Sequence, residues 1–219
     1  MSVLDSTTGA VASAGGQILR AATGLVTARP AAKPLHPRGS VMTGTLHRRG
    51  ARDETGAAWL DRTGEDLVLV RQSRALGLPS PAPDIFGLAI RVPTDGARHG
   101  DLLFATTGLG RLTRFTLTAA RSPYRRPMTT LLPYRTPAGA VLLSAVFLDE
   151  VRIALGWAVG SGHWNRFAEL SLHQDAAGEG DMPLSFDPVE NVLPGLETYD
   201  WVRRLRAPAY VTARRSRRG

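Results

Sequence analysis

The sequence of 219 residues contains no cysteine. This absence excludes disulfide bonds, zinc sites built on thiolates, iron–sulfur clusters and a cysteine nucleophile. It leaves the redox compartment undetermined. Lysine is almost absent as well, because Lys33 is the single lysine among 27 basic residues and the rest are arginines. The net charge of +8 can reflect a GC-rich coding bias as much as a function, so it points only weakly to nucleic acid.

The sequence also lacks an apolar run long enough to span a bilayer. The stretch "AVASAGGQILRAATGLVTA" is interrupted by glycines and by Arg20, and the leader "MSVLDSTTG" is acidic, unlike a secretory signal. We therefore expect a soluble, cytoplasmic protein. Hydrophobic residues make up 43% of the chain, which is enough to bury the core of one domain.

Short strands dominate the expected secondary structure. Residues 10–28 predict a modest helix, and the proline-rich "ARPAAKPLHPRG" after it reads as a connector. We divide the chain into an N-terminal helical arm, residues 1–29, and a β-barrel domain, residues 30–219. Runs rich in Val, Ile and Leu predict strands in "GSVMTGTLHRRG", "DLVLVR", "IFGLAIRV" and "DLLFATTG".

The second half of the chain continues this pattern and then changes. "AVLLSAVFL", "VRIALGWAV" and "NRFAELSLH" predict an antiparallel meander, whereas "LGRLTRFTLTAARSPY" is ambiguous between helix and strand. From Leu196 onward apolar residues follow a helical period, and Pro208 divides that segment into two helical pieces. The expected fold is mainly β with flanking α: an antiparallel barrel with an N-terminal helix and C-terminal helices.

Three stretches carry candidate functional residues, and each has an ordinary structural explanation. Arg206 and Tyr210 are one helical turn apart, and Arg217 lies on the same face, as in a basic surface helix with one inward aromatic ring. His36 follows prolines and can be a loop residue. Arg71 and Ser73, in "VRQS", can be surface residues at the end of a strand.

Taken together, in this order, these stretches resemble the catalase family of haem proteins. "HPRG" is similar to the family's His-Ala-Lys-Gly, "RQS" to its Arg-Phe-Ser, and "PDIFGLAIR" to its Asp-Pro-Arg-Gly-Phe-Ala-Ile-Lys strand. At the C-terminus, Arg206, Tyr210 and Arg217 match the Arg-x-x-x-Tyr and the downstream Arg of the family's proximal helix. The resemblance runs from about residue 30 to the end and implies a catalase-like barrel that binds haem b.

The resemblance also implies a role for each matching residue. Tyr210 would ligate the haem iron as a phenolate, a form that the iron and Arg206 stabilise by their positive charge. His36 would be the distal acid–base group, and Ser73 would orient its ring. The haem propionates would be neutralised by Arg71, Arg217 and Lys33.

The chain departs from the family at two positions. The family's "DLVGNNTP" carries an asparagine that helps to orient peroxide, and the matching "DLLFATTG" has Ala105 there, beside Thr106. We take the Thr106 hydroxyl as the candidate replacement, although it lacks the paired functions of an amide. Pro208, between Arg206 and Tyr210, is the second departure, because it can tilt the arginine away from the tyrosine.

The expected function is therefore a haem-dependent peroxidase-type oxidoreductase that acts on hydrogen peroxide or an organic hydroperoxide, with weak or no true catalase activity. An alternative is a non-catalytic barrel that binds haem or another small ligand. Nucleic-acid binding through the arginine-rich C-terminus is less favoured, because aromatic residues are not interleaved with the arginines. A homo-oligomer is compatible with the sequence.

Overall fold

The structure is a computed structural model that describes residues 38–77, 81–96, 98–173 and 184–205. The expected N-terminal helical arm, residues 1–29, lies outside these residues. The expected second helical piece beyond Pro208 also lies outside them. Among the described residues, no helix is long and apolar enough to cross a membrane.

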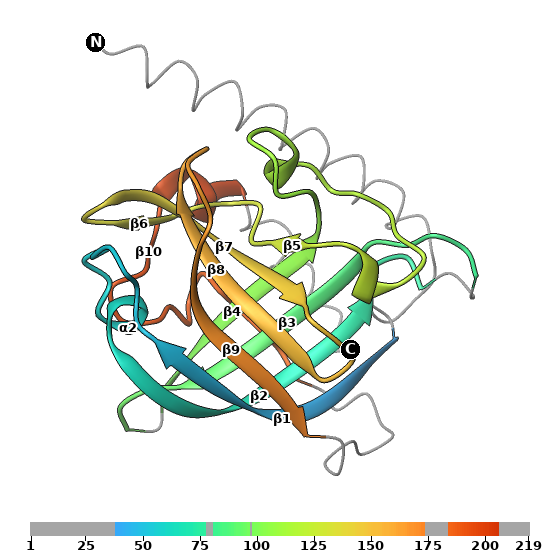
Figure 1. Ribbon diagram of the computed structural model, residues 1–219, viewed down its shortest axis with the longest axis horizontal. Coiled ribbons are helices and arrows are strands. Elements are labelled where there is room, and N and C mark those ends of the chain that lie inside the picture. The colour runs from blue at the N-terminus through green and yellow to red at the C-terminus, as the bar shows by residue number, and fades with distance from the viewer. Residues whose placement is uncertain (1–37, 78–80, 97, 174–183, 206–219) are drawn as a thin grey trace.

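The core of the fold is a closed barrel of antiparallel strands (Figure 1). Strands β1 to β5 pair in chain order, β5 pairs with β7, and β7, β8 and β9 again pair in order. The pairing of β9 with β1 closes the ring. The strands of the ring are β1 (Arg38–Arg49), β2 (Thr63–Arg74), β3 (Phe86–Pro93), β4 (His99–Thr106), β5 (Met128–Thr129), β7 (Gly139–Phe147), β8 (Arg152–Val159) and β9 (Asn165–His173).

Two short strands extend the sheet away from the ring. β6 (Tyr134–Thr136) pairs with the start of β7, and β10 (Glu197–Thr198) pairs with β6. The barrel therefore carries a small side sheet, to which the last described residues of the chain are attached.

Side-chain alternation along the strands separates the inner face of the barrel from the outer one. On β2, Val68 and Val70 are buried in the core, whereas Leu67, the residue before Val68, faces outward and is 66% exposed. On β3, Leu88 and Ile90 are buried in the same core. Because successive side chains of a strand point to opposite faces, the odd-numbered residues of β2 and β3 lie on the outer face.

A single helical turn, α2 (Ala58–Asp61), lies at one end of the barrel (Figure 1). Its Trp59 ring packs edge-on against the ring of Phe167, with 5.7 Å between the ring centroids. Arg48 lies 5.3 Å from the same indole ring and forms an ion pair with Asp66 at 2.8 Å. This buried aromatic cluster packs into the hydrophobic core at the end of the barrel where α2 lies.

The mainly β class and the barrel predicted from the sequence are confirmed, and two local predictions are resolved. The ambiguous stretch of residues 109–124 is neither a long helix nor a strand: it contains the 3-10 turns η1 (Thr113–Phe115) and η2 (Pro123–Arg125). The C-terminal helix begins at residue 200 and not at Leu196. Residues 197 and 198 pair with β6 instead, so strand pairing overrides the helical pattern of the sequence.

Candidate functional site

The described residues include part of the predicted site. Arg71 and Ser73 lie on β2, and Thr106 ends β4. The other predicted site residues, Lys33, His36, Arg206, Tyr210 and Arg217, lie outside the described residues. The geometry of the site is therefore built from β1 to β4.

Arg71 and Ser73 share the outer face of β2. Each lies next to residues of the inner face, and their Cα partners on β1 are Val41 and Gly39, respectively. Both side chains are half-buried. Because the two residues are two positions apart on one strand, their side chains point to the same face, and a cationic group and a hydroxyl group lie on that face as neighbours.

Small residues continue this face across the neighbouring strands. Ser73 is opposite Gly87 on β3, and Gly87 is opposite Ala105 on β4. Directly opposed residues of an antiparallel pair point to the same face, so Ser73, Gly87 and Ala105 form one row across the sheet. In the next row, Arg71 is opposite Ala89.

We call this surface the outer platform. It consists of Gly39, Arg71, Ser73, Gly87, Ala89 and Ala105. Its members other than Arg71 and Ser73 have no side chain or only a methyl group. Its strands β1 to β4 lie side by side in Figure 1. Two larger side chains border it in the row of Arg71: Val41 on β1, opposite Arg71, and Leu103 on β4, opposite Ala89.

Gly39 is required where it stands because of Arg71. A Cβ placed on Gly39 would lie 2.8 Å from Cζ of Arg71 and 2.6 Å from the backbone oxygen of Gln72. Real Cβ atoms do not approach other atoms so closely. The missing side chain therefore makes room for the guanidinium group to lie across the strand.

Thr106 lies on the opposite face from Ser73. It is completely buried, and its Oγ1 accepts a hydrogen bond from the backbone N–H of Phe86 at 3.2 Å. Its neighbour Ala105 is on the outer platform. The hydroxyl group of Thr106 thus connects β4 to the start of β3, and the position that shares a face with Ser73 is occupied by a methyl group.

Asp84 holds the turn that leads from β2 to β3. Its carboxylate, fully buried, accepts hydrogen bonds from the backbone N–H groups of Leu76 at 2.9 Å and Ile85 at 2.7 Å. Its Oδ2 is 3.4 Å from Nε of Arg74. These contacts fix the register in which β2 and β3 bring Ser73 and Gly87 together.

Arg114 is a buried arginine that the sequence analysis did not include among the candidate residues. Its guanidinium donates to the backbone oxygens of Leu109, Gly110, Gly160 and Gly162 at 2.9 to 3.2 Å. Burial lowers its pKa, and the neighbouring charge of Arg111 lowers it further. Four of its five N–H groups donate to backbone oxygens, so Arg114 joins the loop at residues 109 and 110 to the loop at residues 160 and 162. No sequence motif marks it.

Among the residues that the sequence analysis assigns to a haem group, Arg71 and Ser73 lie on the outer platform. A propionate needs a cationic partner when it is taken from water, and Arg71 provides one. Within the described part of the chain, no group of three or more His, Asp or Glu side chains is arranged to hold a metal ion.

No protein-family model matches the sequence, and no curated protein matches it either.

Proposed function

We propose that the protein is a haem-dependent oxidoreductase of the peroxidase type, related to catalases, that acts on hydrogen peroxide or an organic hydroperoxide. The observation that carries the proposal is the outer platform. There Arg71 and Ser73 on β2 share one face of the sheet with four small residues of the neighbouring strands: Gly39, Gly87, Ala89 and Ala105. The closed antiparallel barrel supports it, because the resemblance in sequence implies such a barrel.

The chain's own residues would hold haem b in the following way. Tyr210 would bind the haem iron through its phenolate oxygen, and Arg206 would favour that ionised form by its positive charge. Arg71, Arg217 and Lys33 neutralise the propionates. When bound, the haem supplies the electron-transfer chemistry that no side chain of this protein offers.

The protein itself handles the proton. His36 takes a proton from one oxygen of the hydroperoxide and returns it to the leaving oxygen, as a general base and then a general acid. Ser73 orients the imidazole of His36 through a hydrogen bond. The hydroperoxide becomes an alcohol (or water) and water, and the two electrons and two protons come from a separate reducing substrate.

Ala105 sets the expected preference among peroxide reactions. It is opposite Gly87 in the row of Ser73, and a methyl group can neither donate nor accept a hydrogen bond. Hydrogen peroxide is small and is oriented only by polar contacts. We therefore propose weak or no catalase activity alongside peroxidase activity.

Ala105 also favours a second candidate function, a barrel that binds haem or another small ligand without turning it over. The two candidates share the fold and the haem contacts. They differ in whether a peroxide changes the state of the bound haem.

The test is the visible absorption spectrum of the full chain, purified with haem supplied, before and after addition of hydrogen peroxide or cumene hydroperoxide. The enzyme proposal expects a haem spectrum that changes with peroxide, and a change slowed by His36→Ala. The matched control is His173→Ala, because His173 is exposed and its ring nitrogens lie 3.4 Å and 3.0 Å from the hydroxyl oxygens of Thr43 and Thr45 on the barrel surface. Bound haem whose spectrum does not change with either peroxide supports the second candidate. The absence of bound haem contradicts the enzyme proposal and leaves only a barrel that binds another small ligand.

A further inference from the structure

The loop that joins β4 to β5, residues 107–127, carries five arginines and no acidic residue. We call it the cationic loop. It leaves the barrel after Thr106 and returns at Met128, which pairs with Thr106, so both ends of the loop are anchored at one place (Figure 1). The stretch without Asp or Glu runs further, from residue 102 to residue 148, and includes a sixth arginine, Arg135. The charge of the loop is therefore not offset by residues close to it in the sequence.

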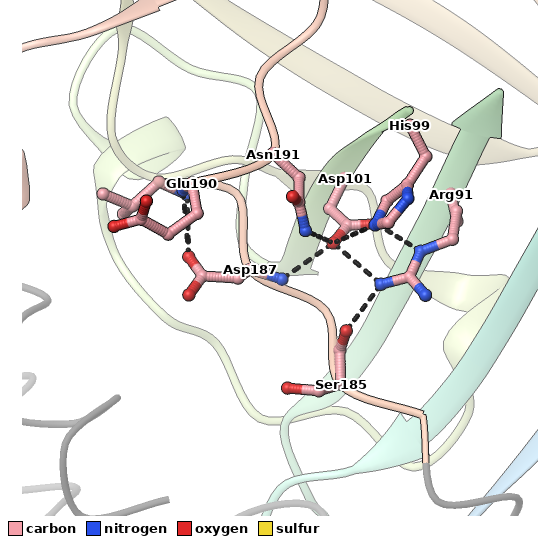
Figure 2. Close-up of polar contacts among 8 residues, drawn as sticks. Arg91, His99, Asp101, Ser185, Asp187, Glu190 and Asn191 are labelled. Atoms are coloured by element: carbon pink, nitrogen blue, oxygen red, sulfur yellow. Dashed lines mark hydrogen bonds and ion pairs between the residues drawn. The ribbon is translucent and has the colours of Figure 1, made fainter. Parts of the chain in front are cut away.

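The acidic residues at the two ends of this stretch are paired with other arginines. Asp101 is fully buried, and its carboxylate accepts hydrogen bonds from Arg91 Nε at 2.8 Å and Nη2 at 2.9 Å (Figure 2). Nδ2 of Asn191 donates to the same carboxylate at 2.9 Å. Asp149 accepts from Nε of Arg152 at 2.7 Å. Both carboxylates are thus engaged away from the cationic loop.

Two of the six arginines bind other groups of the protein, and four do not. Arg114 donates to backbone oxygens, and Arg135 pairs with Glu197 at 2.6 Å. The other four are exposed, and within the described part of the chain none of their side chains forms an ion pair or a hydrogen bond: Arg111, Arg121, Arg125 and Arg126. Four unpaired guanidinium groups on one loop make a surface that attracts anionic partners.

The backbone of the cationic loop is tied to the barrel. Ala120 exchanges two backbone hydrogen bonds with Asp84, each of 2.9 Å. Oγ of Ser122 accepts from the backbone N–H of Tyr124 at 3.3 Å. The Tyr124 ring packs edge-on against the ring of Phe147, with 5.1 Å between the centroids. The arginines therefore project from a backbone that is ordered before a partner arrives, which lowers the entropic cost of binding.

Exposed apolar side chains lie beside the free arginines. Leu112 follows Arg111 and is 76% exposed, and Tyr124 precedes Arg125 and is 44% exposed. A nucleic acid would match the arginines, but it has no apolar region that takes up a leucine side chain. The boundary between lipid headgroups and acyl chains takes up leucine and tyrosine side chains, and anionic headgroups attract arginine. The combination in the cationic loop therefore favours a lipid surface.

We propose that the cationic loop binds the surface of a membrane that contains anionic lipids. The four free arginines contact the lipid phosphates, and Leu112 and Tyr124 enter the headgroup region. The contact is peripheral and reversible. It is independent of the proposed function, because no residue assigned to haem or peroxide takes part in it.

The test measures the partitioning of the full chain onto vesicles by cosedimentation at physiological ionic strength. The vesicles contain phosphatidylcholine and phosphatidylglycerol, or phosphatidylcholine alone. Because the whole chain has a net charge of +8, the test depends on variants that are matched in charge. The loop variant replaces three arginines by glutamine: Arg121, Arg125 and Arg126. The control variant makes the same change at three exposed arginines outside the loop: Arg52, Arg62 and Arg98.

A second pair of variants tests the apolar part of the surface. Leu112→Ser removes the exposed leucine of the cationic loop. Leu67→Ser removes one that is 66% exposed on the outer face of β2. All four variants change exposed side chains only, and an unchanged midpoint of urea unfolding shows that each retains its fold.

We expect the loop variant to partition onto the anionic vesicles about tenfold more weakly than wild type, and the control variant to stay within about twofold. Leu112→Ser should weaken partitioning by about threefold or more, and Leu67→Ser should leave it unchanged. No variant and not the wild type should bind to phosphatidylcholine alone.

Three outcomes overturn the inference, and none of them involves haem. A wild-type chain that does not bind the anionic vesicles removes the membrane contact. Equal losses in the loop variant and the control variant show an effect of net charge and not of the loop. The third outcome uses a labelled single strand of oligothymidylate, measured by fluorescence anisotropy. If the loop variant loses this ligand while Leu112→Ser changes neither ligand, the partner is a nucleic acid.

Discussion

The guanidinium group of Arg71 lies across Gly39 on the neighbouring strand, and it occupies the space that any side chain at position 39 would need. This contact between Arg71 on β2 and Gly39 on β1 lies at the edge of the outer platform. It makes Gly39 a sensitive probe of that surface.

Replacing Gly39 by alanine should destabilise the fold. Within a strand, Gly→Ala is ordinarily stabilising, but here the new Cβ would lie 2.6 Å from a backbone oxygen that cannot move aside. We expect a loss of about 1–3 kcal/mol in the free energy of unfolding, measured by urea denaturation. Ser40→Ala, at the exposed neighbour, serves as the control. A Gly39→Ala protein as stable as wild type would show that the Gln72 backbone oxygen does not approach position 39 this closely.

Ala105 and Thr106 should respond to substitution in different ways. Ala105→Asn adds an amide to the row of Ser73, and we expect faster reaction with hydrogen peroxide, relative to cumene hydroperoxide, at little cost in stability. Thr106→Val removes the acceptor of the Phe86 N–H inside the barrel, and we expect a loss of about 1–3 kcal/mol in unfolding free energy. The peroxide ratio is measured by stopped-flow absorbance. If Thr106→Val alone changed that ratio, the reacting face would be the inner one.

Arg114 should matter for stability far more than its neighbour Arg111. Arg114→Met keeps an unbranched apolar chain in the place of the arginine's methylene groups but removes the guanidinium. Four backbone oxygens then lose their donor: those of Leu109, Gly110, Gly160 and Gly162. We expect a loss of about 3 kcal/mol in unfolding free energy. Arg111→Met, at an exposed arginine, should change it by less than about 0.5 kcal/mol. Equal effects of the two substitutions in urea denaturation would contradict the role of Arg114 as the link between its loops.

The barrel was predictable because most of its strands have a recognisable local sequence pattern. Short runs of Val, Ile and Leu between turn residues predicted β1 to β4 and the meander of β7 to β9, and each forms where it was expected. The start of the last helix was not predictable from Leu196 and Tyr199, because residues 197 and 198 are captured by β6, far away in sequence. The periodicity of apolar residues within one segment contains no information about a pairing strand that is distant in the sequence.

The candidate site was predictable only in part. The sequence predicted Arg71 and Ser73 at the end of a strand, and both lie near the end of β2. The choice between Ala105 and Thr106 needed the register of β4 against β3, because a shift of one residue exchanges the two faces. Arg114 escaped notice for a different reason: its partners Gly160 and Gly162 are brought to it only by the fold.

Tyr199 should titrate above the ordinary range of a tyrosine. Burial raises its pKa, and the positive charge of Arg135 offsets part of that effect. The contribution of Tyr199 to stability is therefore fully present below the unfolded-state pKa of about 10 and is lost as the pH rises through the higher folded-state pKa. Ultraviolet absorbance of tyrosinate, compared between wild type and Tyr199→Phe, measures it. A Tyr199 that ionises at or below the ordinary value would contradict its burial beside Trp201.

The most direct test of the central claim is the absorption spectrum of haem bound to Tyr210→Phe, with Tyr199→Phe as the matched control. Both variants remove one phenol hydroxyl from the C-terminal part of the chain. If Tyr210 is the axial ligand, the Tyr210→Phe protein loses the ferric phenolate spectrum or the haem itself, and Tyr199→Phe keeps both. Identical haem spectra in wild type and Tyr210→Phe would contradict the account.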